Sequence, residues 1–192
     1  MKKLFWGFFF INLNFNLSVN QHTLNVLPDF VGYILLLQGM KELEEESSLF
    51  QGARPFAMGM AVYTAILWVG ALLGVISNGG WVSQLLSLIA MIVALYISWV
   101  LVQGVLDMER SKAADLNGAK LYQWWKGLVA IQVAAKLLYL MANLANISIL
   151  LGLATVLVVV GFVVIVLYLL AWWKSAGAYE ALPRQGIDPE ME

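Results

Sequence analysis

Two charged residues lie inside apolar stretches of the chain, where an isolated charge is costly. Asp29 stands near the start of the apolar run 27–39, and Lys136 lies in the middle of the run 127–145. A charge at the centre of a bilayer costs about 2.5–3.5 kcal/mol on insertion scales. Pairing it with an opposite charge in a protein interior removes much of that cost. We therefore predict that Asp29 and Lys136 face each other.

The two residues also have similar expected depths in the membrane. At a rise of 1.5 Å per residue, Asp29 lies about 18 Å along its helix from Lys41. Lys136 lies about 15 Å along its own helix from Lys126 by the same rise. Asp29 would also sit at the positive end of its helix dipole, which favours the ionised acid.

Four further polar side chains complete a predicted binding pocket around this pair: Asn16, His22, Gln132 and Asn143. Gln132 and Asn143 share a helical face with Lys136. Asn16 and His22 belong to a polar stretch that precedes Asp29, and polar backbone at that depth needs protein or a water-filled cavity around it. A short helix that starts at such a cavity resembles the discontinuous helices of transporters. The pattern predicts an outward-facing polar pocket at Asp29 and Lys136.

Plainer interpretations of the same residues stand beside this one. Lys136 can extend its ammonium to the outer interface while its stem stays in lipid. Asp29 can be a simple helix cap at the outer surface. Gln132 and Asn143 can bond neighbouring helices, with a mean gain of about 0.6 kcal/mol per bond. His22 can be a loop residue with no ligand.

The composition indicates a membrane protein. The 192 residues are 61% hydrophobic and 12% charged, whereas a soluble domain is about 45–50% apolar and about 25% charged. The net charge of −1 argues against a nucleic-acid partner. The chain has no Cys and one His, so we expect no disulfide, no metal site and no cofactor. We see no nucleophile with a base and expect no enzymatic activity.

The apolar runs predict an all-α, polytopic helical bundle with four long spans and two shorter N-terminal segments. The expected segments are 4–17, 28–43, 55–76, 81–106, 121–145 and 147–171. The last four are long enough for about 30 Å of hydrocarbon. We expect one transmembrane domain over residues 1–175 and a soluble C-terminal tail over 176–192.

The N-terminal part is the least regular. Basic Lys2 and Lys3 followed by an apolar run imitate a signal peptide, but no small-residue cleavage site follows, and we expect the segment to be retained. Residues 11–20 alternate apolar and polar at period two, as a strand does. The stretch is therefore either a helix with its Asn side chains turned to protein, or an extended piece paired with residues 23–27.

The basic residues predict the orientation. With six alternating segments, ten of the eleven fall on one side of the membrane: Lys2, Lys3, Lys41, Arg54, Arg110, Lys112, Lys120, Lys126, Lys174 and Arg184. The turns near Asn78 and Asn146 carry no Lys or Arg. By the positive-inside rule, both termini of this multi-pass protein of the cell membrane are cytoplasmic.

An internal recurrence suggests helical-hairpin repeats. Leu36, Gln38, Gly39 and Glu44 recur at an offset of 65 as Leu101, Gln103, Gly104 and Glu109. We infer three tandem helical hairpins, the first of them shortened. Coincidence among apolar helices is the alternative.

The run Leu27-Pro28-Asp29-Phe30-Val31-Gly32-Tyr33-Ile34-Leu35, preceded by alternating Asn and apolar residues, resembles the start of uncharacterised multi-pass membrane proteins of Gram-positive bacteria. The resemblance covers about residues 5–45. It implies a bacterial cytoplasmic membrane and brings no known activity.

Two functions follow from these patterns. The first is a small transporter or ligand-sensing membrane protein that holds a small polar solute at Asp29 and Lys136. The alternative is a non-catalytic accessory or assembly subunit of a membrane complex. In that case the acidic run 42–46 and the link 107–120 would face a membrane-protein partner. Membrane lipids are expected contacts in both cases.

Overall fold

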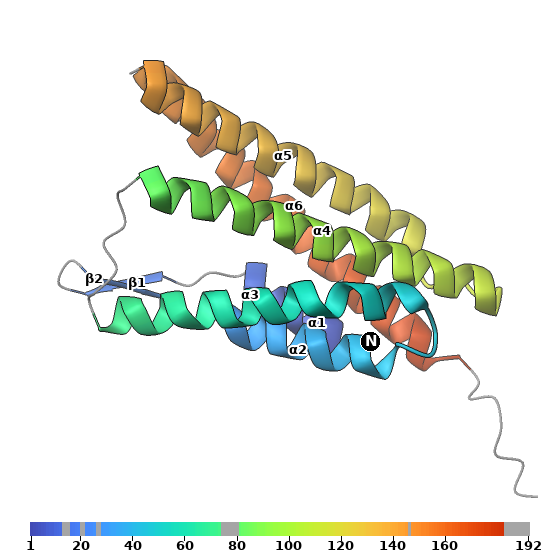
Figure 1. Ribbon diagram of the computed structural model, residues 1–192. Coiled ribbons are helices and arrows are strands. Elements are labelled where there is room, and N and C mark those ends of the chain that lie inside the picture. The colour runs from blue at the N-terminus through green and yellow to red at the C-terminus, as the bar shows by residue number, and fades with distance from the viewer. Residues whose placement is uncertain (13–15, 20–21, 26–27, 74–80, 146, 183–192) are drawn as a thin grey trace, which may run out of the picture.

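The computed structural model describes residues 1–12, 16–19, 22–25, 28–73, 81–145 and 147–182. These form a helical bundle with one short hairpin (Figure 1): α1 (Lys2–Asn12), β1 (Asn16–Val19), β2 (His22–Asn25), α2 (Asp29–Glu42), α3 (Ser48–Leu72), α4 (Trp81–Lys112), α5 (Gly118–Ala145) and α6 (Ser148–Glu180). The last four helices are long and apolar enough to cross a membrane. The predicted fold, a helical membrane bundle with four long spans and two shorter N-terminal segments, is confirmed.

All four long helices extend beyond a predicted end, and α5 begins at Gly118 instead of residue 121. α3 begins at Ser48 instead of residue 55, α4 continues to Lys112, and α6 continues to Glu180. Apolar runs report only the length in contact with lipid, and a helix can continue into water where its ends pack on other parts of the protein. Ser47 caps the start of α3, because its hydroxyl accepts a hydrogen bond from the Leu49 N–H at 3.4 Å.

Within the alternating stretch near the N-terminus, residues 16–19 are extended, whereas residues 11 and 12 belong to α1. β1 and β2 pair antiparallel, with Asn16 opposite Asn25 and Val19 opposite His22. β2 packs against α3, so the hairpin lies against protein, as its backbone polar groups require within a membrane. The period-two pattern therefore identified a strand, and its partner begins one residue earlier than expected.

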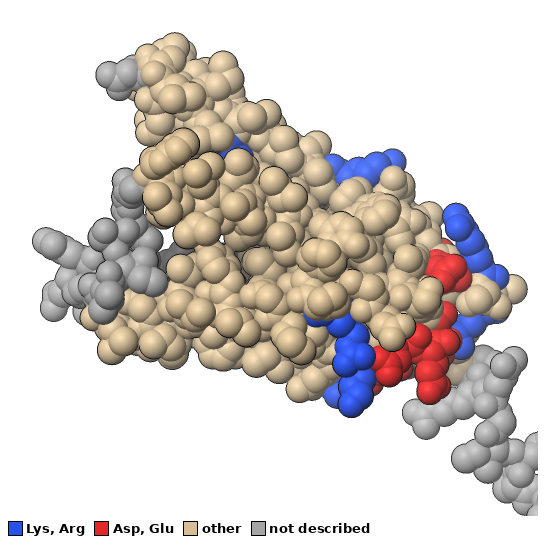
Figure 2. All heavy atoms as spheres, viewed as in Figure 1, with Lys and Arg blue, Asp and Glu red and all other residues tan. Residues whose placement is uncertain are grey.

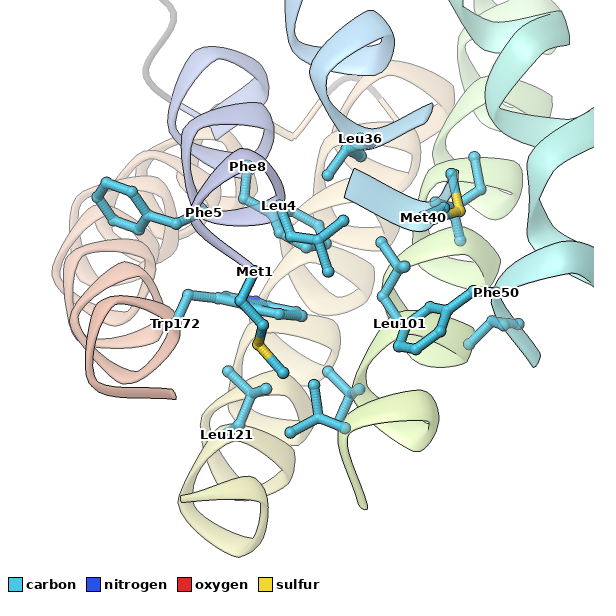
Figure 3. Close-up of a cluster of buried hydrophobic side chains, with 14 of the residues drawn as sticks. Met1, Leu4, Phe5, Phe8, Leu36, Met40, Phe50, Leu101, Leu121 and Trp172 are labelled. Atoms are coloured by element: carbon cyan, nitrogen blue, oxygen red, sulfur yellow. The ribbon is translucent and has the colours of Figure 1, made fainter. Parts of the chain in front are cut away.

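The helices form a closed ring. Each helix packs against the next along the chain, and α6 returns to pack against α1. Inside the ring, Phe8 of α1 and Trp172 of α6 stack with their ring centroids 4.9 Å apart. A second contact between the two helices joins Phe5 edge to face with the half-exposed Trp173 at 5.0 Å. Figure 3 shows Trp172 reaching from α6 into the centre, among Leu4, Phe8 and Leu121.

The charged side chains gather at one end of the bundle, which we call the charged end (Figure 2). It comprises the start of α1, the end of α6, and the α2–α3 and α4–α5 connections. Four ion pairs tie these pieces together: Lys2–Glu180, Lys3–Glu42, Arg54–Glu44 and Lys112–Glu46, at 2.5–2.8 Å. The opposite end, where α3 and α5 end and α4 and α6 begin, we call the far end.

Ion pairing changes the acidity of Glu46. Its partial burial alone would raise the pKa of the carboxyl group. The hydrogen bonds from Lys112 and Tyr179 and the charge of Lys112 outweigh that effect, so the pKa lies below the usual 4.5. The ionised Glu46 carboxylate therefore contributes to the stability of the folded protein. This contribution to the free energy of unfolding is lost as the pH falls through the lowered pKa of Glu46.

Candidate functional site

The predicted ion pair between Asp29 and Lys136 is not formed. The Lys136 ammonium instead donates a hydrogen bond to the Ser87 hydroxyl of α4 at 2.8 Å. The four ion pairs found among the described residues all lie at the charged end. Measured along their helices from the charged end, Asp29 lies about 20 Å deep and Lys136 about 27 Å deep. The physical reason is the ring, which gives α2 the neighbours α1 and α3, and gives α5 the neighbours α4 and α6.

The other predicted site residues also lie apart from one another. Asn143 is exposed near the far end of α5, and its amide donates to the Tyr139 carbonyl of the same helix at 2.7 Å. Asn16 and His22 belong to the hairpin, where their backbones pair with Asn25 and Val19. Their side chains are outside the described part of the structure. Gln132 lies at a cavity inside the ring.

A double-mutant cycle tests the separation of Asp29 from Lys136. We expect the effects of Asp29→Asn and Lys136→Met on the free energy of unfolding to add within about 0.5 kcal/mol, as they do for sites without contact. Unfolding of the detergent-solubilised protein by denaturant measures this. Other partners of either residue cancel in the cycle. A coupling energy well above 1 kcal/mol would mean that Asp29 and Lys136 do interact, as the sequence predicts.

The cavity in the ring, which we call the central cavity, has a volume of about 140 Å³. Five polar side chains from five helices line it: Asn12, Tyr33, Ser98, Gln132 and Tyr168. Apolar residues complete the wall: Phe8, Ile11, Leu36, Ala94, Leu95, Ile97 and Leu128. None of these lining residues carries a charge. Ligand sites in proteins have this form, with a mostly apolar wall and a few convergent polar groups.

The central cavity lies about halfway along the bundle. Its lining residues Asn12, Ser98, Gln132 and Tyr168 lie about 15–21 Å along their helices from the charged end. The hydrocarbon core of a bilayer is about 30 Å thick. Polar groups at this depth face lipid only at high cost, so they turn inward and meet in the ring.

Two of the lining polar groups are held by the protein. The Ser98 hydroxyl donates to the Leu95 carbonyl at 2.9 Å and accepts from the Trp125 indole N–H at 2.9 Å. The Asn12 amide nitrogen donates to the Phe8 carbonyl at 2.9 Å. These bonds fix the orientation of both side chains, and they leave the Asn12 amide oxygen as an acceptor.

Tyr168 is different, because its hydroxyl has no hydrogen-bond partner among the described residues although its side chain is only 1% exposed. Burying a polar group without a partner costs about 1–3 kcal/mol. A hydroxyl in this position therefore favours any molecule in the cavity that can bond to it. Together with Gln132 and Asn12, Tyr168 gives the central cavity both donors and acceptors.

Sequence reasoning found one of the five polar lining residues, Gln132. Asn12 belongs to the Asn-rich alternating stretch, Ser98 is a single polar residue in a long apolar run, and Tyr33 and Tyr168 read as ordinary aromatic core. The shared signal is a polar side chain on each of five helices at a similar distance from the charged end. That signal becomes specific only when the order of helices around the ring is known.

No protein-family model matches the chain, and no curated protein and no solved structure is significantly similar to it. Among the described residues, no group of three or more His, Cys, Asp or Glu side chains could hold a metal ion. The function is therefore argued from the geometry of the central cavity, and the resemblance of residues 5–45 stays a prediction.

Proposed function

We propose that this integral membrane protein binds a small, uncharged, hydrogen-bonding solute in the central cavity and acts as a small transporter or ligand-sensing protein. The observation that carries the proposal is the convergence of polar side chains from five helices, one of which, Tyr168, is buried without a hydrogen-bond partner in the described structure. The proposed site is therefore the centre of the ring and not the Asp29–Lys136 pocket predicted from sequence.

The size and chemistry of the cavity select the solute. A volume of about 140 Å³ exceeds the roughly 10–15 Å³ that one water molecule needs on the same scale, so several water molecules or one small solute fit. The lining has no charged residue to pair with an ion, and a buried unpaired charge is strongly disfavoured. A small amide or polyol, with donors and acceptors of its own, matches Tyr168, Gln132 and Asn12.

The accessory-subunit alternative draws less support from the charged end. Three of the four acids in the run 42–46 already pair within the chain, Glu42 with Lys3, Glu44 with Arg54, and Glu46 with Lys112. A surface whose charges are satisfied internally gains little from a charged partner.

We also propose that the charged end is cytoplasmic, because it gathers the basic residues. We further propose that the protein is not an enzyme, because the cavity lining includes no acid, base or metal-ligand cluster.

Solute-dependent thermal stabilisation tests the proposal. The probes are acetamide and glycerol, with acetate and guanidinium as charged counterparts of similar size. At ten times its Kd a bound solute stabilises by about 1.4 kcal/mol, which raises Tm by roughly 3–5 °C in a protein of this length. We expect a neutral probe to do this and Tyr168→Phe to weaken its binding at least fivefold.

Tyr139→Phe is the matched control, since Tyr139 lies on the exposed surface of α5 and is 44% exposed. It should bind the probe as the wild type does. Uptake of the same solute into proteoliposomes then separates transport from sensing. If charged probes stabilise as well as neutral ones, or if Tyr168→Phe binds unchanged, the central cavity is not the solute site.

A further inference from the structure

One face of α6 carries polar side chains from the central cavity to the charged end. Tyr168, Trp172, Ser175 and Tyr179 follow one another at helical spacings of four, three and four residues, so they share that face. The first three are 0–1% exposed. None of the three has a hydrogen-bond partner for its side chain in the part of the chain that the structure describes. We call this face the polar face of α6.

The polar face ends on partnered groups at the charged end. The Tyr179 hydroxyl donates to the Glu46 carboxylate at 2.9 Å, and the same carboxylate pairs with the Lys112 ammonium at 2.8 Å. Glu46 and Lys112 are each about a quarter to a third exposed, so this end reaches water. At the other end, Tyr168 lines the central cavity. The unpartnered groups therefore lie between a cavity and the aqueous surface.

Ser175 shows that its missing bond is not the usual state of a helical hydroxyl. The hydroxyls of Thr64, Ser98, Ser111 and Thr155 all donate to a carbonyl three or four residues earlier in their own helix. The corresponding carbonyl for Ser175, that of Ala171, accepts instead from the Asn117 amide at 3.5 Å. Ser175 thus has no bond to its own helix and needs a partner from elsewhere.

Trp172 and Tyr168 need a third molecule as well. Neither the Trp172 indole N–H nor the Tyr168 hydroxyl has a hydrogen-bond partner among the described residues. Each unpartnered group can be satisfied by a water molecule, and a water that makes about two to four hydrogen bonds can bridge one polar side chain of this face to the next.

We propose that water molecules occupy the polar face of α6 in single file and connect the central cavity with the aqueous phase at the charged end. Water is the partner of choice, because buried polar groups left unpaired by the protein are ordinarily satisfied by ordered water. A larger ligand does not suit this stretch, where Trp172 stacks on Phe8 at 4.9 Å and lies among Leu4 and Leu121 (Figure 3). The file hydrates the cavity from one side of the membrane and exists whether or not a solute binds there.

Cysteine accessibility tests the water file, and the absence of Cys from the chain means that no native thiol reacts. Ser175→Cys replaces one small polar atom by another on the polar face. The matched control is Ala176→Cys, because Ala176 is equally buried at 1% exposure but is turned away from that face by one residue. The reagent is Ag⁺, which is about the size of a water molecule and binds a thiolate, and a thiolate forms only where water stabilises its charge.

We expect Ser175→Cys to react at least tenfold faster than Ala176→Cys in protein reconstituted into liposomes. Equal and slow reaction of the two variants would overturn the water file. A measurement on the wild type covers the case in which Ser175→Cys does not fold: transfer of magnetisation from water to the indole N–H protons by NMR. The Trp172 N–H should receive it, and the Trp125 N–H, which donates to Ser98 at 2.9 Å, should not.

Magnetisation transfer from water to the Trp172 N–H that is as slow as transfer to the Trp125 N–H would likewise overturn the proposal. The outcomes are separate from those for solute binding. If Ser175→Cys reacts but no solute stabilises the protein, the water file is supported and the solute site is contradicted. If a solute stabilises the protein but Ser175→Cys does not react, the solute site is supported and the water file is contradicted.

Discussion

We expect Gly32→Ala to lower the free energy of unfolding by about 1–3 kcal/mol, the usual cost of adding a methyl group to a packed interior. Gly32 lies in α2 where the helix crosses α1. A Cβ atom there would lie 2.7 Å from the Gly7 carbonyl oxygen and 2.6 Å from Ile11 Cγ1. The Ile11 side chain can move, but the Gly7 oxygen belongs to the backbone. The two helices must therefore separate to admit the methyl group.

The separation should also damage the central cavity. α1 contributes Phe8, Ile11 and Asn12 to its wall, and α2 contributes Tyr33 and Leu36. We thus expect Gly32→Ala to weaken solute binding as well as folding. In membranes, close contacts at small residues supply much of the attraction between helices, because lipid is as apolar as the side chains.

Gly59→Ala is the control. Gly59 lies on α3, and a Cβ atom at this position would meet nothing within 4 Å. Alanine has a better helix propensity than glycine by about 0.8–1.0 kcal/mol, so this variant should be as stable as the wild type or slightly more stable. Denaturant unfolding in detergent compares the two. Equal stability of Gly32→Ala and Gly59→Ala would mean that the α1–α2 crossing is looser than described.

The fold was largely predictable because lipid restricts the alternatives. A long apolar run in a membrane must be a helix, whatever its β-branched content, and this rule placed α3 to α6 in the correct order. The helix ends were less predictable. Residues 48–54 and 172–180 are helical because the charged end packs and pairs them, as Arg54 with Glu44 and Tyr179 with Glu46 show.

The candidate site was less predictable for a geometric reason. A sequence gives the depth of a residue along its helix, but it gives neither the neighbours of that helix nor the direction of its faces. Asp29 and Lys136 were matched by depth alone, and the ring places α2 and α5 without direct packing between them. Gln132 was identified because it shares a helical face with Lys136, and a polar residue within a span turns inward on any helix order.

The internal recurrence gains a structural meaning from two of its residues. Gly39 and Gly104 recur at the offset of 65. A Cβ atom at Gly39 would meet Leu4 of α1 at 2.6 Å, and one at Gly104 would meet Phe50 of α3 at 2.5 Å. In both hairpins the second helix thus receives a large side chain from the first helix at its glycine. The same local packing problem explains the same residue at both places.

We expect Glu109→Ala to destabilise the protein by about 2–4 kcal/mol, because two charge-assisted hydrogen bonds are lost and each is worth about 1.5–3 kcal/mol before partial replacement by water. One Glu109 oxygen accepts from the Leu116 N–H at 2.8 Å and from the Gly118 N–H at 2.6 Å. Gly118 begins α5, so the carboxylate of α4 satisfies donors at the N-terminus of the next helix and complements its dipole.

The same contact fixes the height of α5 relative to α4 and therefore the position of Gln132 and Leu128 in the cavity wall. The connection between the helices is tight, and Asn117 takes a positive φ of 63° within it, so the carboxylate holds a turn that the backbone alone does not favour.

Glu109→Gln keeps an acceptor without the charge and should lose about half as much stability. Glu45→Ala, at an exposed position, should change stability by less than about 0.5 kcal/mol. Hydrogen exchange should show the first turn of α5 opening in Glu109→Ala before the rest of the bundle unfolds. Unchanged protection of that turn would mean that packing of Leu116 and Leu121, both fully buried, holds α5 in place without the carboxylate.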